Sequence, residues 1–451
     1  MRSAGAALVV LLVVGSLACS GAPPPPTASA PPENAPAASA PPADASAAGD
    51  QDQDVVDAYE YVLARWFVMR QEALDFKKGF RWNELVHHPA PGASTPNPSL
   101  DVALSEAWMY VDENSCTMFE LPQITGRYYT VQFVDGWGDV MDNVNERRNP
   151  HHPFGKFAMC LRGATMTFPR EVRRLDLPAR KSRVLMRIEL GADPAEAFAL
   201  QKKITMKASG APKLPKPAPL RPGGDPFPGA EVFDGLEAVL AAEPDHGEGM
   251  EEIQLKARAV SRAAADPAQR ARIEKVIRER AIPAFLADVG KVEVELSGWT
   301  HPRLVGSYGK DYVARSVVNF TALWANHARE TTVFTAADLD GSAAYIQIFA
   351  NTALPRMRVR YLWSVAALDA DTLQVIPNPL KRYRLSKESP LKYNNDNSLT
   401  LAFAPTLPEG IPESNWLPTP AGKRYKLIYR FYGPSRDVVT GQYGPPVLAK
   451  K

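Results

Sequence analysis

The segment YKLIYRFY, residues 425–432, places four large apolar or aromatic side chains on one face of a strand and Lys426 and Arg430 on the other. The segment VLMRIEL, residues 184–190, has the same period of two. Successive side chains of a strand point to opposite faces, so this pattern is typical of a strand with one face against a core. The two segments predict antiparallel sheets in both halves of the chain.

Shorter strand-like runs, separated by turn residues, flank these two segments. They are residues 117–121, 128–134, 157–161 and 165–168 in the first half, and 292–296, 345–349, 359–366 and 399–403 in the second. Several short strands at this spacing predict β-sandwiches. We therefore expect a mainly β fold with a helical insert, in which two antiparallel β domains cover residues 51–211 and 291–451.

The segments around these domains have other compositions. Residues 212–228 are rich in Pro and predict a linker, and residues 229–290 have the apolar spacing of helices. An opening helix is expected within residues 55–74. Asp193 and Asp266 each precede a Pro, which is the pattern of an N-cap and a first helical position.

The N-terminus predicts export. Residues 1–18 contain Arg2, a short apolar run and small residues, which is the pattern of a secretory signal peptide. The position of Cys19 resembles the lipidation site of bacterial lipoproteins, although Ser16 stands where Leu is favoured. Cleavage nearby without lipidation, giving a secreted protein, is the alternative.

Residues 19–50 consist mostly of Pro, Ala and Ser, with no aromatic residue, Val, Ile or Leu. Such a composition cannot bury enough apolar surface to offset the entropy of ordering, so it predicts a disordered tether. No later apolar run is long enough to cross a membrane. We expect a lipid-anchored protein of the bacterial cell envelope, at the outer membrane and facing the periplasm.

The charge and the cysteine content narrow the possible classes of protein further. With 52 basic against 50 acidic side chains, the chain has no electrostatic drive toward nucleic acid. Of its 3 Cys, Cys116 and Cys160 remain after Cys19. In an oxidising compartment the two form a disulfide, or they are two buried thiols.

Established catalytic motifs are absent from the sequence: there is no Gly-x-Ser-x-Gly, no phosphate-binding loop, no His-Glu-x-x-His and no paired Cys-x-x-Cys. No cofactor is expected. The pairs His87-His88 and His151-His152 are better interpreted as surface residues than as metal ligands, because neighbouring strand residues point to opposite faces.

Several segments resemble a bacterial two-domain family of unknown function, domain of unknown function 1254 followed by domain of unknown function 1214. The segments are WNELVH (82–87), DVALSEAW (101–108), TGRYY (125–129) and DGW (135–137) for the first domain, and LDGS (339–342), LWS (362–364), PNP (377–379), LKYNNDNSL (391–399) and NWLPTP (415–420) for the second. The resemblance implies a β-sandwich followed by a jelly-roll-like domain, and no agreed activity. The chain departs from the family at residues 138–139 and 145–152, and at Leu104.

The segment after residues 128–134 carries the candidate site. Asp135, Trp137, Asp139 and Arg147 combine two carboxylates, an aromatic ring and a cation on what we expect to be an exposed loop. The alternative is a structural loop in which Trp137 packs into the core and Arg147 or its neighbour Arg148 pairs with a nearby carboxylate. Trp363, Tyr383 and Trp416 could line a groove or fill the core, and core packing is favoured.

These observations favour a non-enzymatic ligand-binding or structural module of the cell envelope. The expected ligand is a glycan, a lipid or a small apolar molecule, and the expected partner is the membrane, through the lipid anchor. The alternative is a hydrolase without a recognisable motif that uses the carboxylates of Asp135 and Asp139.

Overall fold

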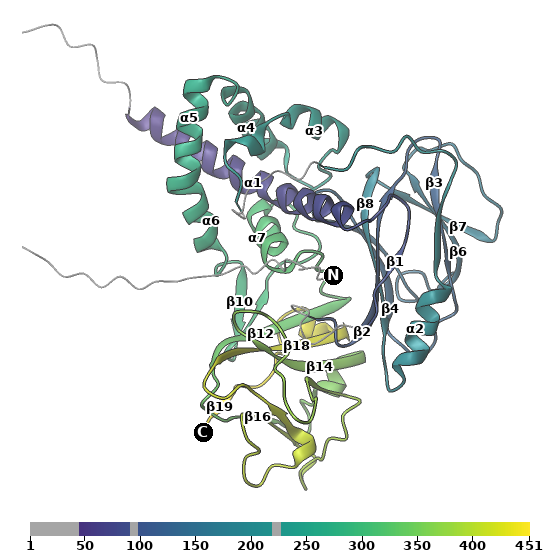
Figure 1. Cartoon of the computed structure of the whole chain (residues 1–451), viewed down its shortest axis with the longest axis vertical. Helices are drawn as coiled ribbons and strands as arrows, with labels where there is room; N and C mark the ends of the chain where they lie inside the picture. Colours follow the sequence, from purple (N-terminus) through teal and green to yellow (C-terminus); the bar gives the residue numbers. More distant parts are fainter. Residues whose placement is uncertain (1–44, 91–97, 219–226) are drawn as a thin grey trace, which may run out of the picture.

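The computed structural model describes residues 45–90, 98–218 and 227–451. Figure 1 shows a β body made from the first half of the chain, a second β body made from its last third, and a group of helices beside both. No helix in the described ranges has the length and apolarity needed to cross a membrane. The predicted signal peptide and Cys19 lie outside these ranges, and helix α1 (Ala45–Lys77) begins within the predicted tether.

The first β body consists of two sheets, with strand orders β1-β2-β8-β4-β5 and β7-β6-β3-β9. The strands of the first sheet are β1 (Val86–His87), β2 (Val102–Tyr110), β8 (Lys181–Glu189), β4 (Tyr129–Val134) and β5 (Val140–Val144). Those of the second are β7 (Val172–Leu177), β6 (Gly155–Leu161), β3 (Cys116–Leu121) and β9 (Thr205–Ser209). Side chains such as Phe119, Phe133 and Met186 form one core of this body. The predicted β-rich fold is confirmed.

The five-stranded sheet is buried on both faces. Every residue of β4 is buried, whereas a strand with one solvent-exposed face would alternate. Val131 and Phe133 belong to the core of the first β body, while the Gln132 amide nitrogen donates to the carbonyl oxygen of Ala325 at 3.0 Å. The second face of this sheet therefore contacts the later part of the chain.

The second β body also has two sheets, with strand orders β10-β11-β12-β18-β14-β15 and β17-β16-β13-β19. The strands of the larger sheet are β10 (Glu293–Leu296), β11 (Trp299–Pro302), β12 (Thr331–Asp340), β18 (Arg424–Pro434), β14 (Val359–Asp369) and β15 (Arg384–Ser386). Those of the smaller are β17 (Trp416–Pro418), β16 (Leu399–Ala404), β13 (Tyr345–Phe349) and β19 (Ala449–Lys450). Tyr425, Leu427, Tyr429 and Phe431 all enter the core, as their alternation predicts.

The helices come from three separate parts of the chain. They are α1, then a 3₁₀ turn (Ala230–Phe233), α3 (Leu236–Ala242), α4 (Glu251–Ala263), α5 (Pro267–Val276), a π segment (Ile277–Ala281) and α6 (Ile282–Asp288), and finally α7 (Tyr312–Ala322). Their apolar side chains share one core with Trp137 of the first β body. Helix α1 thus packs with the helical segment, although its residues fall within the range expected for the first β domain (Figure 1).

Smaller helical elements lie inside the β bodies. They are α2 (Pro194–Lys203), α8 (Arg436–Val439) and two 3₁₀ turns, Pro355–Arg358 and Glu413–Asn415. Both predicted N-caps are present: the Asp193 carboxylate accepts from Ala195 N, and that of Asp266 accepts from two backbone amides. The predicted strand at residues 165–168 is wrong. The next strand, β7, runs parallel to β6, so these residues form part of the crossover that a parallel pair requires.

Cys116 and Cys160 form a disulfide. They lie directly opposite each other on the antiparallel strands β3 and β6, with their Cα atoms 4.4 Å apart. The sequence left open a disulfide or two buried thiols, and the structure contains the disulfide. It joins two strands of the four-stranded sheet of the first β body.

Glu60 of α1 makes the stability of the folded protein depend on pH. Its Oε1 is buried without a hydrogen-bond partner among the described residues. Burial raises the pKa of Glu60 to about 8, and the carboxylates of Asp288 and Asp57 add to this rise, while Lys291 opposes it. The folded chain therefore keeps this proton up to about pH 8, whereas the unfolded chain releases it above about pH 4.5, so stability falls across that window.

We expect Glu60→Gln to remove this loss. Between pH 6 and pH 8 the free energy of unfolding of the parent should fall by about 2 kcal/mol relative to that of the variant. Urea unfolding at the two pH values measures the difference. Glu279→Gln changes an exposed carboxylate of the same helices and should behave like the parent. The same pH dependence in Glu60→Gln and the parent would contradict the assignment.

Candidate functional site: an arginine-lined pocket

Residues 135–139, expected as an exposed loop, form a buried hairpin turn between β4 and β5. Asp135 N donates to Asp139 O at 2.9 Å, and the Asp135 carboxylate accepts from the amides of Trp137 and Asp139 at 2.8 and 3.0 Å. Strand β5 follows immediately. The exposed loop expected to carry Asp135 to Arg147 is therefore interrupted by a strand, and the turn itself has an ordinary hairpin length.

Trp137 is covered by helices. Its side chain is 1% exposed and packs on the Tyr61 ring with the centroids 5.0 Å apart. The indole nitrogen donates to the carbonyl oxygen of Glu243 at 3.1 Å, and the Arg65 and Arg315 guanidinium groups lie over the ring. The expectation that this turn is free of core packing is wrong, because α1, α7 and the segment after α3 cover it.

The carboxylates of Asp135 and Asp139 also interact with other groups within the protein. Arg315 of α7 pairs with Asp139 at 3.0 Å and with Asp245 at 2.8 Å. Burial, together with the charge of Asp139, raises the pKa of Asp135 to about 7. Burial alone would raise the pKa of Asp245, but the charge of Arg315 outweighs it and lowers that pKa. The arrangement fastens the hairpin to the helices.

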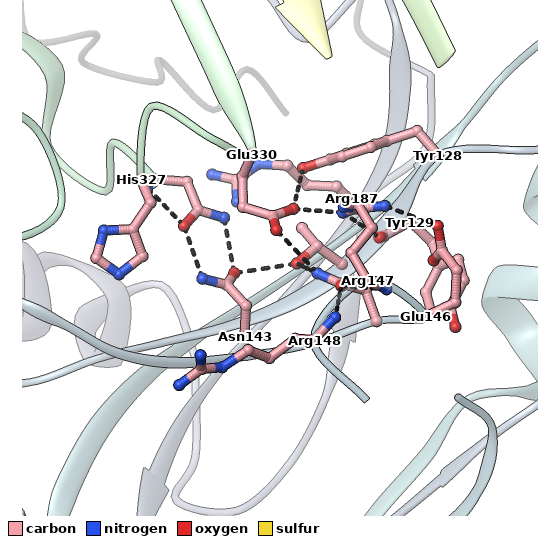
Figure 2. Close-up of polar contacts among 12 residues, drawn as sticks. Tyr128, Tyr129, Asn143, Glu146, Arg147, Arg148, Arg187, His327 and Glu330 are labelled. Carbon is pink, nitrogen blue, oxygen red and sulfur yellow. Dashed lines mark hydrogen bonds and ion pairs between the residues drawn. The ribbon is translucent and has the colours of Figure 1, made fainter. Parts of the chain in front are cut away.

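Arg147 lies beyond the opposite end of β5, so the four predicted site residues do not form one cluster. Figure 2 shows Arg147 in an ion pair with Glu330, the residue that precedes β12. Its neighbour Arg148 pairs with Asp142 at 3.2 Å, which is one of the structural pairings that the sequence left open. Arg147 thus belongs to the junction of the two β bodies rather than to the Asp139 turn.

The junction around Arg147 is polar and closely paired. Asn145 Nδ2 donates to Glu330 Oε1 at 3.2 Å, and the Arg147 guanidinium lies 5.0 Å from the ring centre of Tyr128 and 4.9 Å from that of Tyr361. Asn143 and Asn326 exchange two amide hydrogen bonds of 3.0 and 2.8 Å (Figure 2). These contacts fix Arg147 and neutralise its charge with Glu330.

A pocket of about 340 Å³ opens next to this junction. Its lining comes from both β bodies: Arg147, Arg329, Met357, Val359, Arg360, Gly433, Pro434 and Ser435. In the six-stranded sheet Thr331 pairs with Tyr432 and Val359 with Pro434, so the start of β12, the start of β14 and the end of β18 meet at one end of the sheet. This register brings distant segments of the chain to the pocket.

Two of the three arginines of the pocket have no carboxylate partner among the described residues. Arg329 and Arg360 are exposed, and neither forms an ion pair with any residue that the structure describes. Val359 and Met357 add apolar surface beside them. A guanidinium group presents several N–H donors in a planar fork that matches carboxylate and phosphate oxygens. The pocket is therefore suited to a ligand with an anionic group and an apolar part.

Sequence reasoning missed Arg329 and Arg360. One signal was available: residues 356–360, RMRVR, contain three Arg within five positions, separated by apolar residues. Arg329 carries no such signal. Its position depends on strand pairing between residues about 100 positions apart, Thr331 and Tyr432.

The other candidate residues form hydrogen bonds or pack against apolar side chains within the protein. His87 contacts Ser105 and His88 contacts Glu106, each at 2.8 Å, and the described residues contain no group of side chains that could hold a metal ion. Trp363 lies in the core of the second β body. Tyr383 packs against a small apolar cluster and the Trp416 indole donates to Ala404 O at 2.8 Å.

Two family models match the chain, one in each β body. The family described as protein of unknown function (DUF1254) matches residues 82–208, and the one described as protein of unknown function (DUF1214) matches residues 330–436. A search of curated proteins finds no match. The pocket joins the two matched regions, because Arg147 lies in the first while Val359, Arg360 and Pro434 lie in the second.

A solved structure has a similar fold. The crystal structure of the VPA0106 protein from Vibrio parahaemolyticus is 18% identical, with a TM-score of 0.64, and the match covers 89% of this chain and 100% of that chain. A putative uncharacterized protein from Burkholderia cenocepacia is 11% identical, with a TM-score of 0.41, over 89% of this chain and 93% of that chain. The first likeness shows the fold alone.

Proposed function

The chain belongs to the two-domain family of unknown function that joins DUF1254 to DUF1214, and we propose that it is a non-enzymatic binding module whose ligand carries a phosphate or carboxylate. The observation that carries the proposal is the pocket between the two matched regions. In it Arg329 and Arg360 are exposed and have no carboxylate partner in the part of the chain that the structure describes. Of the ligands that the sequence favours, a neutral apolar molecule fits these guanidinium groups least.

We also propose that the protein acts in the bacterial cell envelope, held at the outer membrane by a lipid on Cys19. The signal pattern of residues 1–18 and the Pro-rich composition of residues 19–50 support this proposal. A hydrolase based on Asp135 and Asp139 is not favoured by the geometry. The first carboxylate accepts two backbone amides and the second pairs with Arg315, so both are engaged within the fold.

Replacing Arg329 and Arg360, which have no ion pair with a described residue, should weaken binding of a small anion. Glycerol 3-phosphate is the probe, and glycerol is its neutral counterpart. Because charge-assisted hydrogen bonds contribute about 1.5–3 kcal/mol, Arg329→Gln with Arg360→Gln should weaken binding at least about tenfold. Isothermal titration calorimetry at low salt measures the affinities, and glycerol should show no heat of binding.

The matched control carries Arg162→Gln and Arg173→Gln. These two arginines are exposed on the first β body and have no ion pair with a described residue, so the control makes the same change in net charge. It should bind glycerol 3-phosphate as the parent does. The proposal fails if the parent binds no phosphate or carboxylate probe, or if both double variants lose affinity equally.

A further inference from the structure

We infer that the anionic group bound in this pocket is the phosphate of a membrane lipid headgroup, reached while the protein lies on an anionic bilayer. The inference rests on the proposed function and names its ligand class. It is carried by the surface around the pocket, where cations and exposed apolar side chains occur together.

The cations form a basic rim, which we define as Arg329, Arg356 and Arg360. Arg329 and Arg360 line the pocket, and Arg356 directly precedes Met357, which also lines it. All three are exposed, and none has an ion pair with a residue in the described ranges. The neighbouring Arg358 differs, because it pairs with Asp437 at 2.7 Å. A basic residue near an anionic membrane surface contributes attraction, and three beside one pocket act together.

Two exposed side chains next to the basic rim are apolar or aromatic. Met357, which lines the pocket, is 55% exposed, and Tyr393 is 42% exposed. The Arg356 guanidinium lies 5.3 Å from the Tyr393 ring centre, so the 3₁₀ turn Pro355–Arg358 and the loop of Tyr393 are adjacent. Tyr393 does not line the pocket, so the binding of a small soluble anion there does not require it.

An anionic bilayer accounts for the whole surface. Tyrosine is favoured at the level of the headgroups, where its ring is in apolar surroundings and its hydroxyl is in water. Met357 can enter the same layer while guanidinium groups bind the phosphates. The pocket volume of about 340 Å³ exceeds that needed for a phosphate alone and leaves space for the glycerol part of a headgroup.

The test measures the oxidation of Met357 by hydrogen peroxide in the full chain, using peptide mass spectrometry. The protein is mixed with vesicles of phosphatidylglycerol, with vesicles of phosphatidylcholine, or with glycerol 3-phosphate. An exposed thioether oxidises readily, and contact with a bilayer slows the reaction. Met166 and Met206, which are partly buried in the first β body, are internal references. The readout is local, so attachment of the N-terminus to a vesicle does not produce it.

Phosphatidylglycerol vesicles should protect Met357 but not the reference residues, and phosphatidylcholine vesicles should not protect it. Loss of two cations from Arg329→Gln with Arg360→Gln should weaken vesicle binding about 25-fold. Tyr393→Ser should weaken protection by vesicles and leave the affinity for glycerol 3-phosphate unchanged, because this residue lies outside the pocket.

The outcomes separate the inference from the proposed function. Binding of glycerol 3-phosphate without protection of Met357 by vesicles overturns the inference and leaves the proposed function standing. Equal protection by both kinds of vesicle also overturns it, since the headgroup charge would then be irrelevant. If neither glycerol 3-phosphate nor the vesicles bind, both proposals fail.

Discussion

Replacing Arg315 by Met is expected to lower the free energy of unfolding by about 3–5 kcal/mol. The guanidinium of Arg315 is fully buried and pairs with Asp139 and Asp245, so its removal leaves two carboxylates without their cation. A buried charge without a partner is far more costly than the net contribution of the intact pair. Urea unfolding, followed by tryptophan fluorescence, measures the loss because Trp137 lies against the same guanidinium.

Two further variants test this explanation. Adding Asp245→Asn to the Arg315→Met variant should recover part of the stability, because it removes one of the unpaired carboxylates. Arg424→Met breaks an exposed pair with Asp338 and should cost less than about 1 kcal/mol. If Arg315→Met costs no more than Arg424→Met, the Arg315 pairs do not hold the hairpin to the helices.

The sequence predicts those parts of the fold that depend on local periodicity. Strands β8 and β18 were predicted because a period of two is visible within seven or eight residues. The N-caps at Asp193 and Asp266 were predicted because capping involves neighbours only two or three positions away. Such features need no knowledge of the rest of the chain.

The arrangement of the helices depends instead on contacts between distant residues. Ser316 Oγ of α7 donates to Glu60 O of α1 across 256 positions. Helix α7 lies between β11 and β12, within the range that composition assigns to the second β domain. Its packing against α1 has no local signature, so the sequence predicts neither helix as part of a common core.

The candidate site was misplaced for the same reason. A charged turn with a Trp predicts an exposed functional loop when only its own residues are considered. The residues that bury it, such as Glu243 and Arg315, come more than 100 positions later. Arg147 does line the pocket, but the exposed cations beside it, Arg329 and Arg360, come from the other β body.

Trp137→Ala is expected to destabilise the protein by about 3–5 kcal/mol, the usual cost of removing a large buried aromatic side chain. The indole fills the space between Tyr61 and the guanidinium groups of Arg65 and Arg315, and its removal leaves a cavity among charged groups. Thermal unfolding should therefore begin at a lower temperature in the variant. Its midpoint, read by circular dichroism, measures the loss.

Trp137→Phe separates packing from hydrogen bonding at this position. The smaller ring retains most of the apolar contact but not the 3.1 Å hydrogen bond to Glu243 O, so the loss should be much smaller, at about 1–2 kcal/mol. Phe154→Ala, which changes an exposed ring, should have little effect. Under conditions where Trp137→Ala remains folded, its affinity for glycerol 3-phosphate should equal that of the parent, because Trp137 does not line the pocket. A variant that kept the stability of the parent but lost this affinity would return the ligand site to the Asp135 turn.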